Sequence, residues 1–120
     1  MGISYDAFPQ LLRDRVAGFD AVYAEHLEDY DEVLPHVLVG DLLRFITEVV
    51  VRENSLNAAV NEAMRLLEEA ASGSDTRLQE LVAVSFVENL EPQECGFDLI
   101  RGAMGPVLAE QYQVYEDARA

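Results

Sequence analysis

The sequence LPHVLVGDLLRFITEVVV, residues 34–51, decides the fold class of this chain. Its apolar residues recur with the period of an α-helix and cover one broad face of a helical wheel. They are Leu38, Val39, Leu42, Leu43, Phe45, Ile46, Val49 and Val50. The opposite face carries Asp41, Arg44, Glu48 and Arg52, so that opposite charges are one turn apart. Because Pro35 suits the first turn of a helix, the pattern predicts a central helix from about 35 to 52.

Both flanks of this helix continue the helical periodicity, and no segment shows the strict alternation of a half-buried strand. Further helices are expected at 4–17, 55–71, 76–90, 96–104 and 106–118, and within 19–33 a short helix starts at Asp20 and gives way to an acidic, turn-like passage before Pro35. In this short helix we expect Val22, Tyr23 and Leu27 to face inward, and in the helix 106–118 Val107, Leu108, Gln111, Val114 and Tyr115. The prediction is an all-α fold, a compact orthogonal or HEAT-like stack of six to seven antiparallel helices forming one domain over residues 1–120.

The charge of the chain limits its partners. It has 23 acidic residues against 8 basic ones, all of them arginine, and a formal net charge of −15. Such a field repels nucleic acid and anionic membranes and attracts basic proteins, although acidity also serves simply to keep a small protein in solution. No uninterrupted apolar run is long enough to cross a bilayer, and the single cysteine, Cys95, fits a reducing cytoplasm. We therefore expect a cytoplasmic protein with no membrane partner and no direct nucleic-acid contact.

No catalytic or metal-binding motif is assembled in the sequence. Neither His26 nor His36 has a glutamate at the spacing of a di-iron site, and zinc needs more histidine or cysteine than the chain contains. Both histidines are interpreted as surface residues. Cys95 has the acidic neighbours Glu94 and Asp98, which disfavour a reactive thiolate, and Ser85 lies within an apolar helix rather than at a nucleophile elbow. We predict no enzyme activity, no cofactor and no metal.

Two groups of polar residues remain as candidate sites. The first, Ser85, Glu88 and Asn89, lies in the predicted helix 76–90 and is interpreted as structural, bonding a neighbouring helix end or loop backbone, with ligand contact as the alternative. Asp41 and Arg44 are likewise interpreted as structural polar residues. The second group is the acidic run around one tyrosine: Glu25, Glu28, Asp29, Tyr30, Asp31 and Glu32. It resembles the combination of anchor and charge in an interface hot spot, and the alternative is a solvated turn.

Three stretches carry a resemblance to a known group of proteins: LPHVLVGD (34–41), VSFVENLEP (84–92) and GPVL (105–108). In these the chain resembles small, acidic, all-helical bacterial proteins of an uncharacterised family. Several such families occur beside polymorphic or contact-dependent toxins and are interpreted as immunity proteins. The resemblance implies a toxin partner, and it supplies no catalytic residue.

The leading hypothesis is a non-enzymatic binding protein, an immunity or antitoxin-type inhibitor that binds a basic, nuclease-like toxin through an acidic face. One rival is a regulator that mimics nucleic acid with spaced carboxylates. Another is a structural or assembly subunit that self-associates through an apolar face of the last helix. The oligomeric state, monomer or homodimer, is left open by the sequence.

Overall fold

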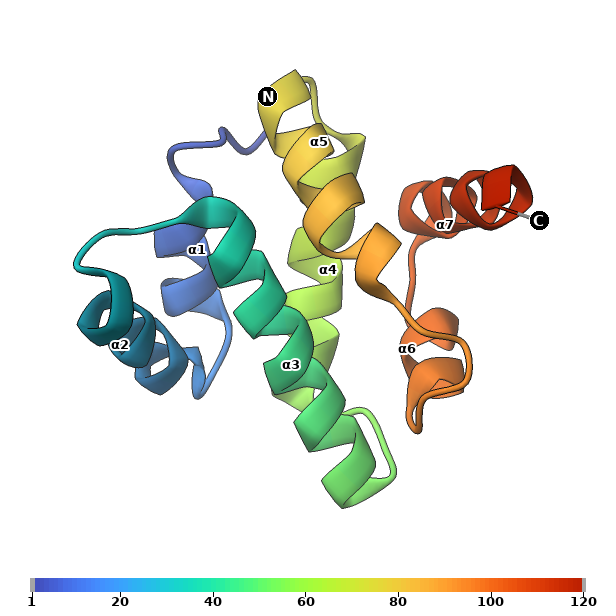
Figure 1. The fold of residues 1–120 in the computed structure, drawn as a ribbon, viewed down its shortest axis with the longest axis horizontal. Helices are drawn as coiled ribbons and strands as arrows, with labels where there is room; N and C mark the ends of the chain where they lie inside the picture. The colour runs from blue at the N-terminus through green and yellow to red at the C-terminus, as the bar shows by residue number, and fades with distance from the viewer. Residues whose placement is uncertain (1, 120) are drawn as a thin grey trace.

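The computed structural model describes residues 2–119, which form seven α-helices and one 3-10 helix and contain no β-strand. The elements are α1 (Phe8–Arg15), α2 (Phe19–Tyr30), α3 (Pro35–Glu53), α4 (Ala58–Ser72), α5 (Thr76–Ser85), η1 (Val87–Asn89), α6 (Phe97–Gly102) and α7 (Pro106–Arg119). The prediction of an all-α fold with six to seven helices is confirmed. Figure 1 shows α3, α4 and α5 in the middle, with α1 and α2 on one side and α6 and α7 on the other. In that view α7 runs crosswise to α3 and α4, so the packing is crossed rather than a parallel stack.

The central helix α3 begins and ends close to its predicted limits, with Pro35 in the first turn. Its predicted apolar face is the one that packs, and the fully buried members are Leu38, Val39, Leu42, Ile46, Val49 and Val50. On its polar face Asp41 pairs with Arg44, while Arg52 pairs with the adjacent Glu53 at 3.3 Å rather than with Glu48. The helix is therefore central because one broad apolar face is covered by α2, α4, α5 and α6.

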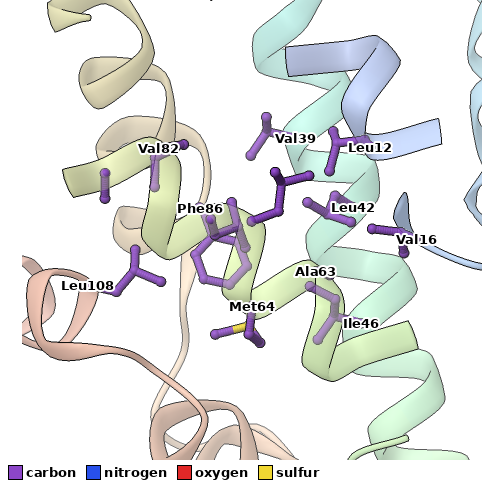
Figure 2. Close-up of a cluster of buried hydrophobic side chains, with 14 of the residues drawn as sticks. Leu12, Val16, Val39, Leu42, Ile46, Ala63, Met64, Val82, Phe86 and Leu108 are labelled. Atoms are coloured by element: carbon purple, nitrogen blue, oxygen red, sulfur yellow. The ribbon is translucent and has the colours of Figure 1, made fainter. Parts of the chain in front are cut away.

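The core is a single cluster to which most helices contribute (Figure 2). Met64 of α4 and Phe86, just after α5, lie near its centre, with Leu12 of α1, Leu42 of α3 and Leu108 of α7 around them. No helix among residues 2–119 combines the length and apolarity that crossing a bilayer requires.

Helix ends follow local polar contacts that periodicity does not reveal. The predicted helix 76–90 was wrong beyond Ser85, because the Asn89 side-chain amide donates to the Ser85 carbonyl at 3.0 Å and so replaces a backbone donor. The short second helix, α2, ends at Tyr30, and Asp31 adopts a left-handed φ of 61° where the expected turn-like passage begins. The N-cap of α4 is Asn57, whose side chain accepts from the Val60 N–H at 2.9 Å.

Two predicted inward residues face outward instead. Leu27 is 36% exposed and Val114 is 63% exposed. The inward positions of those helices are occupied by His26 and Tyr112, both buried. A purely apolar criterion misassigned these faces, because a histidine and a tyrosine with satisfied polar atoms pack as well as an aliphatic side chain.

Carboxylates connect elements that are distant in sequence. Asp75 caps α5 and also accepts from the backbone N–H of Tyr5 at 2.7 Å. That bond, followed by those from Leu78 and Arg77, lowers the pKa of Asp75. Glu68 of α4 accepts from the backbone N–H groups of Val107 and Leu108, each at 2.9 Å. The first segment and the last helix are thus both attached through charge-assisted hydrogen bonds.

Candidate functional site

A cleft of about 210 Å³ lies between α2 and α3, and we refer to it as the α2–α3 cleft. It is lined from α2 by Val22, Glu25, His26, Asp29 and Tyr30, and from α3 by Asp41, Arg44, Phe45 and Glu48. The two helices pack against each other along this line, with α2 beside α3 in Figure 1. The cleft thus joins the predicted acidic run to the polar face of the central helix.

The inner wall of the cleft is formed by His26, which is only 2% exposed. Its Nε2 accepts the Leu34 backbone N–H at 3.0 Å, so its Nδ1 carries the proton and donates to Asp41 Oδ2 at 3.1 Å. This network assigns the neutral Nδ1–H tautomer, and both ring nitrogens are engaged. The interpretation of His26 as a surface histidine was wrong, because its two polar atoms are satisfied inside the fold. His26 positions Asp41 and the start of α3.

Above this inner wall, one cation and one aromatic ring face the solvent. Arg44 pairs with Asp41 and its side chain is 71% exposed, whereas that of Asp41 is 13% exposed. Tyr30 is 45% exposed, and its ring lies 5.0 Å from that of His26 between centroids. Because His26 and Arg44 both engage Asp41, this carboxylate is committed to the structure.

The remaining acidic side chains of the cleft are free. Among residues 2–119, the carboxylates of Glu25, Asp29 and Glu48 make no hydrogen bond or ion pair, and all three residues are exposed. With Asp41, four carboxylates face one guanidinium, so the cleft carries a net negative charge. Such a concave negative surface attracts a cation and strengthens its interaction by excluding part of the water.

The structure brings together only part of the predicted acidic group. Glu25, Asp29 and Tyr30 line the cleft, whereas Glu28, Asp31 and Glu32 are exposed outside it. Sequence reasoning missed Phe45 and Glu48, which reach the cleft from α3. The polar face of α3 could have indicated Glu48, since Asp41, Arg44 and Glu48 recur at helical spacing. A short connection joins α2 to α3, which favours neighbouring positions for the two helices.

The second predicted polar group lies elsewhere and links three elements. The Ser85 hydroxyl and His36 Nδ1 are 2.6 Å apart, joining the end of α5 to the first turn of α3. Glu88 contributes its backbone carbonyl, which accepts from the Tyr115 hydroxyl at 3.2 Å, while its carboxylate is exposed. Ser85 is 4% exposed, so its hydroxyl and His36 have the geometry of a structural contact between helices.

Metal coordination has no candidate in the part of the chain that the structure describes, since no three His, Cys, Asp or Glu side chains of residues 2–119 converge suitably. Cys95 lies exposed in the connection before α6.

Comparison with known proteins gives one match. No curated protein and no solved structure is significantly similar to the chain. A family model described as "Domain of unknown function (DUF7674)" matches residues 9–119, from the first turn of α1 to the end of α7. Its description names no toxin and no source organism, so the immunity relationship implied by the resemblance remains a proposal. Since the match covers nearly the whole chain and all its helices, the chain belongs to the DUF7674 family.

Proposed function

We propose that this chain is a cytoplasmic, non-enzymatic binding protein whose α2–α3 cleft receives a cationic side chain of a basic protein. The observation that carries the proposal is the convergence of three free carboxylates, those of Glu25, Asp29 and Glu48, beside the exposed ring of Tyr30. The net charge of −15 supports it, because an overall negative charge accelerates the encounter with a basic partner.

The dimensions of the cleft favour a protein side chain over a small molecule. Its volume of about 210 Å³ is below the range of about 300–1,000 Å³ typical of small-molecule sites. A guanidinium or ammonium group fits the chemistry of the walls, since it can contact the carboxylates and lie over the face of Tyr30 in a cation–π interaction. Arginine suits the site better than lysine, because its planar group pairs with a carboxylate and stacks on an aromatic ring at once.

The specific form of this proposal is immunity: the acidic face occupies the phosphate-binding surface of a basic, nuclease-like toxin and so inhibits it. This form is supported by the resemblance in residues 34–41, 84–92 and 105–108 together with the sign of the charge. A concave cleft suits insertion of one partner side chain, whereas mimicry of a nucleic acid calls for carboxylates spread along an extended surface.

The test is isothermal titration calorimetry with two probes: the product of the gene adjacent to this one, and an arginine-rich peptide. The triple variant Glu25→Gln, Asp29→Asn, Glu48→Gln removes the free carboxylates. The control, Asp6→Asn, Glu80→Gln, Glu94→Gln, makes the same change in net charge at exposed positions outside the cleft. We expect the cleft variant to weaken binding about tenfold or more and the control to weaken it by less than about threefold.

Equal losses in both variants would show that net charge alone drives binding, and no binding at low salt would remove the proposal. A gel-shift competition addresses the rival: displacement of DNA from a DNA-binding protein by this chain would favour nucleic-acid mimicry over capture of a side chain.

A further inference from the structure

A second concave surface is lined by residues of α5, η1 and α7, and Figure 1 shows α7 and α2 on opposite sides of α3 and α4. This groove, of about 400 Å³, runs between α7 and the end of α5 with η1, and we refer to it as the α7 groove. Its apolar wall consists of Ala83, Val87, Val107, Val114 and Ala118. Val114 is the most exposed of the large hydrophobic side chains among residues 2–119, at 63%. The apolar lining and the exposed valine are typical of a protein-docking surface.

One wall residue of the α7 groove has an unmet hydrogen-bonding requirement. The Oε1 atom of Gln111 is buried and has no hydrogen-bond partner within residues 2–119. Buried acceptors are satisfied in most folded proteins, because leaving one unpaired costs free energy. Because Oε1 is buried in the free protein, a docked chain could supply the missing donor only after the Gln111 side chain rotates towards the groove.

The charged side chains of the α7 groove indicate the sign of the charge that its occupant carries. Glu88 and Glu110 line it, both are exposed, and neither carboxylate makes a hydrogen bond or ion pair in the described part of the chain. The nearby cation of α7, Arg119, is already paired with Glu116 at 3.0 Å. The groove therefore complements a segment that carries basic side chains beside an apolar stripe.

The secondary structure of the walls favours a helical occupant. Both walls are helical, and residues 2–119 contain no β-strand whose edge could accept an added strand. A groove between two helices commonly binds an amphipathic helix whose apolar anchor residues are three and four positions apart. A second copy of this chain fits poorly, since each copy has a net charge of −15 and would bring more negative charge to Glu88 and Glu110.

We propose that the α7 groove docks an amphipathic helix of a different protein, with an apolar stripe on Val107 and Val114 and with lysine or arginine side chains against Glu88 and Glu110. This interface is separate from the α2–α3 cleft, so the chain has two binding surfaces on opposite sides of its central helices. A protein so built can hold two basic segments simultaneously.

The test uses nuclear magnetic resonance titration of the isotope-labelled chain with a designed helical peptide that has a leucine stripe flanked by arginines. In the triple cleft variant, whose α2–α3 cleft lacks the free carboxylates that would bind an arginine, the expected shifts are confined to α5, η1 and α7. Val114→Ser, which removes apolar contact area without adding charge, weakens binding about fivefold. Glu110→Gln weakens it about threefold and more at low than at high salt. The matched control Val51→Ser, at a valine that is 49% exposed on α3, leaves affinity unchanged, and the triple cleft variant weakens binding by less than about threefold, as expected for the loss of net charge alone.

Four outcomes overturn the proposal, the last of them measured on the triple cleft variant. The first is absence of binding at millimolar peptide. The second is equal binding of a scrambled peptide of the same composition, which would show nonspecific attraction. The third is a dimer in light scattering that Val114→Ser dissociates, which would make a second copy the occupant. Loss of binding in the triple cleft variant would instead place the peptide in the α2–α3 cleft. Circular dichroism of each variant confirms that the helices are retained.

Discussion

His26 shows how one buried side chain can position two neighbouring elements. Its ring is buried, and its two nitrogens hold the Leu34 N–H and the Asp41 carboxylate. The first bond positions the entry into α3, and the second fixes the acidic side chain nearest the inner wall of the α2–α3 cleft. These bonds link α2, which carries Glu25 and Asp29, to α3, which carries Glu48.

His26→Ala is expected to destabilise the fold by about 2–4 kcal/mol, because it leaves a cavity and two polar groups without a partner. The measurement is urea denaturation at neutral pH. His36→Ala is the matched control, since His36 is exposed and makes one side-chain hydrogen bond, and we expect it to cost no more than about half as much. Equal losses for the two histidines would contradict the role given to His26.

Tyr112 gives the chain a dependence on alkaline pH. Burial, followed by the hydrogen bond that its hydroxyl donates to Glu116 at 2.7 Å, raises the pKa of Tyr112 to about 12. An unfolded tyrosine titrates near pH 10, so the stabilisation is complete below about pH 10 and is lost as the pH rises towards 12. Ultraviolet absorbance of tyrosinate will show one late-titrating group that Tyr112→Phe removes. A titration curve unchanged by that substitution would be inconsistent with this assignment.

At the scale of elements, the helices themselves were accessible from the sequence but their pairing was not. The stretch 34–51 predicts α3 because its apolar face is broad and its period is regular. The α2–α3 cleft needs α2 to lie beside α3, and no feature of residues 25–32 specifies that neighbour. For the same reason Glu25, Asp29 and Tyr30 were found as candidates, whereas Glu48 was assigned only to an ion-paired helix face. The end of α5 at Ser85 depended on a side-chain contact of Asn89, which periodicity does not record.

The N-cap of α4 provides a direct test at this scale. Asn57→Ala removes the acceptor of the Val60 N–H and is expected to destabilise the protein by about 1 kcal/mol. Asn61→Ala, at an exposed position on the same helix, is expected to be neutral or slightly stabilising, because alanine has the higher helix propensity. Thermal unfolding followed by circular dichroism distinguishes the two. If Asn61→Ala cost more than Asn57→Ala, the cap would be misassigned.

At the scale of the whole molecule, we expect repulsion among the excess acidic residues to change the free energy of unfolding more than the surface ion pairs do. In the pairs of Arg13 with Asp20 and of Arg65 with Glu62, one partner is largely exposed, Asp20 at 72% and Arg65 at 65%, and such solvated pairs contribute little. Repulsion among the acidic residues, reflected in the net charge of −15, acts over the entire surface.

Added sodium chloride is therefore expected to raise the melting temperature at neutral pH, because screening weakens the repulsion more than it weakens the pairs. Differential scanning calorimetry across a series of salt concentrations shows whether the melting temperature rises or falls. A melting temperature that falls with salt would mean that ion pairs such as Arg15 with Glu62 dominate.

The attachment of α7 through Glu68 has a kinetic consequence. Amide protons in the first turn of a helix usually exchange rapidly with solvent, since they lack an intrahelical acceptor. Here two of them, on Val107 and Leu108, are held by one carboxylate from α4. Hydrogen–deuterium exchange should accordingly find these two amides protected in the wild type and released together in Glu68→Ala. Helix α7, which forms one wall of the α7 groove, is therefore held in place by Glu68 in the free protein.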